Sequence, residues 1–294
     1  MSVFRLARYS VDIGTLATIE VGEHRADSPT LIYLHGWQDN SATFVSVMEN
    51  VAEISPFTEQ IAVDFPGHGY SSHRPVGDFY AFHDYLDDLH QLLTKLARKK
   101  VIFVGHSLGG FVASCYSAAF PERVVGCLQI EGFGPLSEDD SQSVSRMRNG
   151  ILSRARIRNK MESASQRGYK NLEDAVSHKA QALGLSSELV KGIVERGVEQ
   201  RGERYFWRHD VKLHALSVYR MSERHARNVT QYLNCPYIVM LGSQSRTYLP
   251  VDSTTQELHI PNSEFVTVDG GHHCHLEHPD VCAKLINKLI IRSH

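Results

Sequence analysis

The chain has 294 residues, a hydrophobic content of 42% and a charged content of 22%, which are ordinary values for a globular protein of one large or two modest domains. Its formal net charge of −2 gives no reason to expect a nucleic acid or an acidic membrane surface as a partner. The sequence contains neither an apolar run of about 18 residues that would span a membrane nor a signal peptide at its start, so we expect a cytoplasmic protein.

Short apolar runs alternate with helical patterns through the first half of the chain and return near its end. Runs of this length, without polar interruption, are typical of strands that are buried on both faces. The alternation predicts a mostly parallel sheet covered by helices on both sides. The expected strands are 16–21, 31–34, 61–63, 101–104, 124–130, 237–241 and 265–268, and the expected helices include 79–96, 111–120 and 281–291.

The segment 141–234 differs from the rest in pattern and in charge. It shows helical spacing without a convincing strand, and it contains 18 Lys and Arg against 9 Asp and Glu, whereas the remainder has 13 basic and 24 acidic residues. We therefore predict an α/β core formed by 1–135 and 235–294, with a helical cap inserted at 136–234. A small-molecule substrate is expected to bind in the cleft between them.

The run Gly105-His106-Ser107-Leu108-Gly109 lies between the expected strand 101–104 and the expected helix 111–120. A Gly-x-Ser-x-Gly at a strand-to-helix turn is typical of a nucleophile elbow, in which flanking glycines make room for a strained serine. The adjacent helix N-terminus favours negative charge. We predict that Ser107 is a catalytic nucleophile.

A serine nucleophile needs a general base, and in this arrangement the base follows the last strand. Here the segment 269–279 carries Gly270-Gly271 directly before His272, which permits a sharp turn, so His272 is the predicted base and His273 the alternative. Four histidines within seven residues also suggest a metal site, but their spacing matches no closed zinc pattern. We expect His275 and His278 to be structural, and we predict no metal and no cofactor.

The five cysteines of the chain show no CxxC spacing and are expected to be free thiols in a reducing compartment.

An oxyanion hole requires two backbone N–H groups. One is expected from Leu108, the residue after the nucleophile, and the other from Trp37, which follows the turn at His35-Gly36. The Pro- and Gly-rich loop 64–71 contains Asp64 and His68, for which we expect hydrogen bonding within the loop rather than catalysis.

These motifs resemble the α/β-hydrolase superfamily, and more closely the serine hydrolase-like proteins. The resemblance implies the α/β-hydrolase fold, with an eight-stranded, mostly parallel sheet and an inserted helical cap, and it names no substrate. It rests on four motifs in this order: His35-Gly36-Trp37-x-Asp39-Asn40, Asp64-x-Pro66-Gly67-x-Gly69-x-Ser71, Gly105-x-Ser107-x-Gly109-Gly110 and Gly271-His272.

One position departs from the superfamily pattern. Where an aspartate is expected in Gly-x-x-Asp after the penultimate strand, this chain has Ser245. Some members place the acid one strand earlier, where Glu131 ends an apolar run, an expensive place for a carboxylate without a partner. We predict that Glu131 orients His272, while a purely structural role for it stays open. Other candidates for the acid are Asp252, Asp139 and Asp140.

These residues predict a serine hydrolase that cleaves a carboxylic ester or thioester through an acyl-enzyme. One alternative is a carbon–carbon bond hydrolase whose carboxylated substrate would be bound by Arg154, Arg156, Arg158 and Lys160, although such a basic run is more often a solvated helix face. A second alternative is a non-catalytic binding protein, which only Ser245 at the acid position favours.

Overall fold

The central sheet has eight strands in the order β1-β2-β4-β3-β5-β6-β11-β12. The computed structural model describes residues 3–162, 168–245, 260 and 263–293. From β4 to β12 every neighbouring pair is parallel, whereas β1 pairs antiparallel with β2, and β2 with β4. The predicted sheet is thus confirmed, with β1 added. Its strands are β1 (Arg5–Val11), β2 (Gly14–Val21), β3 (Thr30–Leu34), β4 (Gln60–Val63), β5 (Val101–His106), β6 (Val124–Ile130), β11 (Tyr237–Gly242) and β12 (Ser263–Val268).

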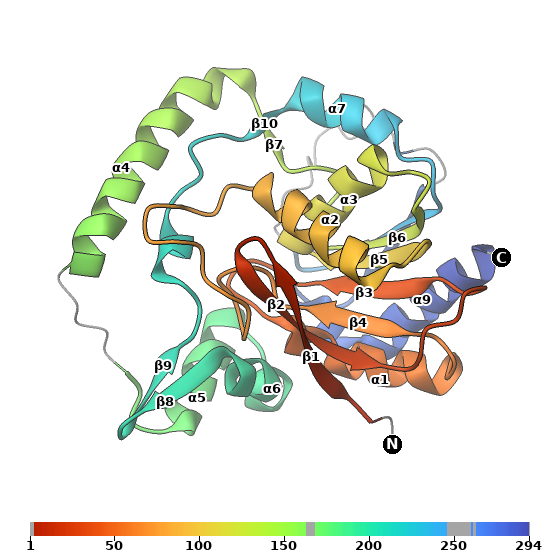
Figure 1. The fold of residues 1–294 in the computed structure, drawn as a ribbon, viewed down its shortest axis with the longest axis horizontal. Coiled ribbons are helices and arrows are strands. Elements are labelled where there is room, and N and C mark those ends of the chain that lie inside the picture. The colour runs from red at the N-terminus through yellow and green to blue at the C-terminus, as the bar shows by residue number, and fades with distance from the viewer. Residues whose placement is uncertain (1–2, 163–167, 246–259, 261–262, 294) are drawn as a thin grey trace.

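Helices cover both faces of this sheet (Figure 1). One apolar cluster joins the sheet to α2 (Asp84–Leu96) and α3 (Leu108–Ala119), and a second joins its other face to α1 (Val45–Ile54) and α9 (Pro279–Arg292). Strands β3 and β5 are buried along their whole length, as their apolar runs 31–34 and 101–104 predict. The short helix α8 (Cys274–Glu277) precedes α9.

Two expectations about the helices need correction. The helix predicted over 79–96 begins only at Asp84, because Phe79 and Tyr80 are buried in the preceding loop. The pattern also missed α1.

The chain between β6 and β11 forms a separate group of elements that curves around one side of the sheet (Figure 1). It has its own small apolar cluster, which includes Ala175, Val190, Val194 and Val198. Its elements are β7 (Ser137–Glu138), η2 (Asp140–Gln142), α4 (Ser143–Glu162), α5 (Leu172–Leu183), α6 (Ser187–Gly197), β8 (Val198–Arg201), β9 (Arg204–Trp207), η3 (Val211–His214), β10 (Met221–Ser222) and α7 (Glu223–Gln231).

The expectation that 141–234 lacks strands was wrong. Strands β8 and β9 form an antiparallel hairpin whose turn contains Gly202 at a φ of 61°, and β10 pairs with β7. Four residues are too few to show a clear alternation, so the hydrophobic pattern could not reveal these strands.

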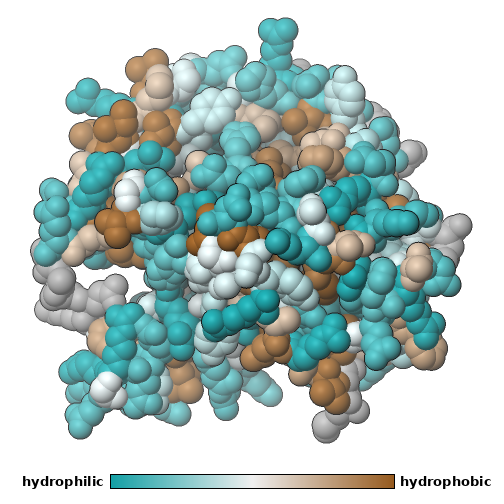
Figure 2. Space-filling model, in the orientation of Figure 1, coloured by the Kyte–Doolittle hydropathy of each residue, from teal (hydrophilic) through white to brown (hydrophobic). Residues whose placement is uncertain are grey.

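Hydrophobic side chains appear over α4 in the space-filling view (Figure 2), where Val144, Met147, Ile151 and Leu152 are exposed. None of the helices in the described part of the chain has the length and apolar content needed to span a bilayer. All five cysteines are buried free thiols, as expected.

Candidate active site

Ser107 lies at the sharp turn between β5 and α3. Its φ of 47° and ψ of −114° fall in a region that is costly for any residue except glycine. The flanking glycines are required by space, because a Cβ at Gly109 would lie 1.9 Å from the carbonyl oxygen of Leu34, and one at Gly105 would lie 2.6 Å from the backbone of Gly109. The turn therefore has the geometry that the sequence predicted for a nucleophile elbow.

His272 is held next to this turn by its own backbone. Its carbonyl oxygen is 2.7 Å from Nε2 of His106, the residue before Ser107, and the two rings lie 4.8 Å apart. Its side chain is one-third exposed, and its Nδ1 lies 3.3 Å from Oε2 of Glu131. The structure thus brings together the predicted base and the predicted acid, which are separated by 141 positions in the sequence.

Glu131 follows β6 and is completely buried. Its backbone has a φ of 57°, and its N–H donates to the carbonyl of Met240 in β11. One carboxylate oxygen, Oε1, accepts a hydrogen bond of 2.6 Å from the backbone N–H of Gly242. The other, Oε2, accepts from the hydroxyl of Ser245 and faces Nδ1 of His272. The N–H of Gly242 and the hydroxyl of Ser245 therefore orient this carboxylate toward the histidine.

Ser245 occupies the position where the superfamily pattern has an aspartate, and its hydroxyl contacts the carboxylate on the neighbouring strand. This contact was not predicted, although a serine at the position of the missing aspartate, next to a relocated acid, could have suggested it. Of the other candidates for the acid, Asp252 lies outside the described residues. Asp139 accepts hydrogen bonds from the backbone and hydroxyl of Ser141 at an exposed turn, and Asp140 is also exposed.

The loop after β3 places the N–H of Trp37 beside the elbow. Nδ1 of His35 and the backbone N–H of Asp39 lie 2.7 and 3.2 Å from the carbonyl oxygen of Gly36. Because the C=O and N–H of a trans peptide point in opposite directions, these contacts turn the Trp37 N–H the other way. Within the described part of the chain, neither this N–H nor that of Leu108 donates to a protein acceptor. Both predicted oxyanion donors are therefore available.

The neighbouring histidines hold loops in place. Nε2 of His68 accepts from the N–H of Gln38 at 3.0 Å, and Nε2 of His275 lies 2.8 Å from the hydroxyl of Thr43. Burial holds the pKa of His68 and of His275 well below the usual value, so both rings are neutral. His278 precedes α9, and His273 lies 3.8 Å from Asp39, away from Glu131. This arrangement favours His272 over His273 as the base.

The side chain of Asp64 makes a hydrogen bond within the loop 64–71, as expected, but its other contacts lie outside that loop. Its buried carboxylate pairs with Arg196 of α6 at 2.8 Å and accepts hydrogen bonds from Ser41 and from the N–H of Tyr70. This ion pair ties the segment between β6 and β11 to the loops of the sheet.

A cavity of about 390 Å³ opens above the elbow. Ser107, Leu108 and Trp37 line it from the sheet side, together with core residues such as Tyr80, Phe82 and Phe111, and the segment between β6 and β11 supplies the other lining residues. Most of the lining is apolar or aromatic, which is typical of a site for a small organic ligand. The residues contributed by that segment include Leu136, Leu213, Leu216, Tyr219 and Met221.

Two arginines, Arg146 and Arg220, also line the cavity, and Arg146 pairs with Glu138. The predicted basic run lies elsewhere, since Arg154 and Arg158 pack over the ring of Phe79 and neither belongs to the cavity lining. Arg156 and Lys160 are exposed and also lie outside the lining. The basic groups that could meet a substrate are therefore not those proposed from sequence.

Residues 29–279 match the family described as alpha/beta hydrolase fold. A serine hydrolase-like protein of Danio rerio is 28% identical over 266 residues, covering 88% of this chain and 81% of that protein. A 2-(acetamidomethylene)succinate hydrolase of Mesorhizobium japonicum is 37% identical over 131 residues, covering 45% of this chain and 44% of that protein. Among solved structures, a hypothetical protein of Pseudomonas aeruginosa PAO1 has a TM-score of 0.84 and 27% identity, with 98% of each chain covered.

Proposed function

The chain belongs to the alpha/beta hydrolase family, and we propose that it is a serine hydrolase that cleaves the carboxylic ester or thioester bond of a small substrate through an acyl-enzyme. The family and the similarity to serine hydrolase-like proteins support hydrolysis. The observation that carries the proposal is the 3.3 Å approach of Nδ1 of His272 to the buried carboxylate of Glu131, with the carbonyl of His272 in contact with His106, the residue before Ser107. An imidazole held in this way donates its Nδ1 proton to the acid and keeps Nε2 as a base.

In the proposed mechanism, Nε2 of His272 removes the proton of the Ser107 hydroxyl while its oxygen attacks the substrate carbonyl. The N–H groups of Trp37 and Leu108 stabilise the negative oxygen of the tetrahedral intermediate. His272 then returns the proton to the leaving alcohol or thiol, and an acyl group remains on Ser107. A water molecule, activated by the same histidine, hydrolyses this acyl-enzyme and frees the serine.

We further propose that the segment 136–234 acts as a cap that selects the substrate, because it supplies much of the cavity lining above Ser107. The apolar and aromatic lining favours a short acyl group without charge. The cap is fixed to the core by the Asp64–Arg196 ion pair and by hydrogen bonds such as that from the hydroxyl of Tyr80 to Asp210.

The test is hydrolysis of p-nitrophenyl acetate and butyrate by the purified protein. We expect Ser107→Ala to lower the rate by about 10³-fold or more, as the loss of other triad members does. The matched control, Ser145→Ala, removes a hydroxyl on the exposed α4 and should leave the rate unchanged. Equal rates for Ser107→Ala and the parent would refute the proposal.

A non-catalytic binding protein is the alternative that is favoured by Ser245, because a serine stands where the superfamily pattern has the catalytic acid. The contact of Ser245 with Glu131 argues against this alternative, because the serine hydroxyl donates a hydrogen bond to a carboxylate that can serve as the acid. Labelling by a fluorophosphonate distinguishes the two, since only an activated serine reacts. Labelling of the parent but not of Ser107→Ala supports the hydrolase, and failure to label the folded parent supports the binding protein.

A second candidate function is a carbon–carbon bond hydrolase that acts on a carboxylated substrate. Arg146 and Arg220 in the cavity lining favour it, because guanidinium groups bind carboxylates. Rates on p-nitrophenyl butyrate and on the p-nitrophenyl half-ester of succinic acid compare a neutral with a charged acyl group of similar length. A preference for the charged ester would direct the search to carboxylated diketones, and a preference for the neutral ester would exclude this candidate.

A further inference from the structure

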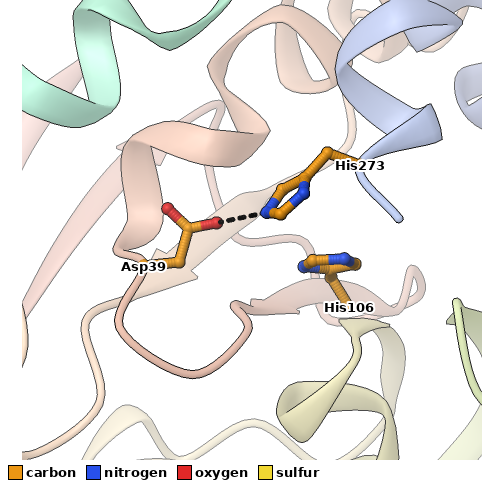
Figure 3. A group of neighbouring side chains, drawn as sticks. All are labelled: Asp39, His106 and His273. Atoms are coloured by element: carbon orange, nitrogen blue, oxygen red, sulfur yellow. Dashed lines mark ion pairs between the residues drawn. The ribbon is translucent and has the colours of Figure 1, made fainter. Parts of the chain in front are cut away.

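Three side chains that the proposed mechanism does not use converge next to the elbow (Figure 3). They are Asp39, His106 and His273, and each offers one carboxylate oxygen or ring nitrogen within 4.8 Å of the other two. None of them lines the cavity above Ser107. They come from the three segments that carry the proposed oxyanion donor Trp37, the nucleophile and the base.

Two of these polar atoms are deeply buried and lack a hydrogen-bond partner among the described residues. They are Oδ2 of Asp39 and Nδ1 of His106, whose residues are only 4% and 1% exposed. Buried polar atoms are almost always paired, because an unpaired one loses its hydration without compensation. The other oxygen of Asp39 accepts from the N–H of Asn40, so Oδ2 alone faces the cluster without a donor.

The hydrogen bonds of His106 determine which of its nitrogens carries the lone pair. Its Nε2 lies 2.7 Å from the carbonyl oxygen of His272, which can only accept, so Nε2 carries the proton. A second proton on Nδ1 would have no acceptor, because that buried atom has no hydrogen-bond partner among the described residues. Nδ1 of His106 is then an acceptor, as is Oδ2 of Asp39. Two acceptors therefore face the same small space.

His273 does not satisfy this pair directly. Its Nε2 lies 3.8 Å from Oδ2 of Asp39, which is too long for a hydrogen bond. Two imidazole nitrogens and one carboxylate oxygen thus lie close together without hydrogen bonds to one another. Such a donor set matches the preference of zinc and similar metal ions.

We propose that Asp39, His106 and His273 form a binding site for a divalent transition-metal ion, with Zn²⁺ as the expected occupant. Bonds of about 2.0–2.1 Å place two ligand atoms of a tetrahedral Zn²⁺ about 3.4 Å apart, so the 3.8 Å gap between His273 and Asp39 closes by about 0.4 Å on binding. The prediction of no metal considered only the histidines of 269–279, and two of the three ligands lie outside that run. The bound ion would tie together the three segments that position the reacting groups.

The experiment uses the full-length protein after dialysis against a chelator, with Co²⁺ as a coloured substitute for Zn²⁺. We expect visible absorption bands that saturate at one Co²⁺ per chain and disappear when Zn²⁺ is added. Asp39→Asn and His273→Gln should each weaken Zn²⁺ binding by about 100-fold or more, since even indirect support of a metal ligand is worth 10–100-fold. The chain has 17 histidines, so the matched control is His178→Gln, which changes an exposed histidine on α5 and should bind Zn²⁺ like the parent.

Circular dichroism and melting without metal show whether each variant is folded. If a variant fails to fold, X-ray absorption of the Zn²⁺-loaded parent replaces it, and the proposal requires nitrogen and oxygen neighbours without sulfur. Two results would overturn the proposal: the absence of saturable Co²⁺ bands in the folded parent, or equal Zn²⁺ affinity in the parent and the folded Asp39→Asn variant. Either result would leave a buried water molecule as the partner of the two acceptors. Because the readout is metal binding, the outcome is independent of the proposed esterase activity.

Discussion

The acid assigned to Glu131 leads to a prediction whose size follows from its contacts. In Glu131→Gln the side chain keeps its shape, but only the amide oxygen can still accept a hydrogen bond. The N–H of Gly242 requires an acceptor at the position of Oε1, so the amide oxygen will point there. The amide NH₂ then takes the position of Oε2, 3.3 Å from Nδ1 of His272.

This orientation forces the wrong tautomer on His272. Facing an NH₂ donor, Nδ1 must accept, so the ring proton moves to Nε2, which can no longer take the proton of Ser107. Loss of the correct tautomer in a triad lowers kcat by about 10⁴-fold, which corresponds to about 5.5 kcal/mol of transition-state stabilisation. We expect a loss of this size in kcat/KM for p-nitrophenyl acetate.

The contact of Ser245 with the same oxygen makes a rescue possible. Adding Ser245→Asp to Glu131→Gln returns a carboxylate beside His272, at the position where the superfamily usually has it. We expect the double variant to recover about 10²-fold or more of the lost activity. Ser245→Ala in the parent keeps the acid and removes one hydrogen bond, so it should cost about 3–10-fold.

The assay is steady-state hydrolysis with each variant checked by circular dichroism. A folded Glu131→Gln variant that retains more than about a tenth of the parent kcat/KM would refute the assignment of the acid. Attention would then move to Asp252.

Two further predictions concern stability. Arg196→Met leaves the fully buried carboxylate of Asp64 without its ion-pair partner, so the free energy of unfolding in urea should fall by about 3–5 kcal/mol. The control is Lys284→Ala, which breaks an exposed ion pair with Asp280 and should change this free energy by less than about 0.5 kcal/mol. A small loss in Arg196→Met would show that the pair contributes no net stability. Burial, assisted by the nearby His214, Lys179 and His73 and opposed by Asp210, lowers the pKa of His209 to about 4. The folded state therefore disfavours protonation of His209. Its lowered pKa contributes about 3 kcal/mol to the free energy of unfolding above pH 6.5, and this contribution is lost as the pH falls toward 4. Thermal melts between pH 7 and pH 4.5 should show a smaller loss for His209→Phe than for the parent, and equal losses would contradict the predicted titration.

Much of the fold could be predicted from the sequence because its signals are local. Strands β3 and β5 are buried on both faces, so each contains a continuous apolar run, 31–34 and 101–104, and the glycines around Ser107 are required by a turn of only five residues. The predicted base, His272, also has a local signal, because paired glycines precede it. Short or mostly polar elements, such as the hairpin of β8 and β9, lack such a signal, since their pairing depends on the rest of the chain.

The acid and the proposed metal ligands depend on contacts between distant segments. Glu131 and Ser245 meet only because β6 and β11 pair in parallel, which places the residues after both strands at the same edge of the sheet. Asp39, His106 and His273 converge for the same reason at the carboxyl ends of their strands. The sequence by itself determined the sheet and the turn at Ser107, and it predicted His272 as the base. Only the tertiary structure decided which carboxylate faces His272, because register between strands brings together residues whose spacing along the chain carries no signal.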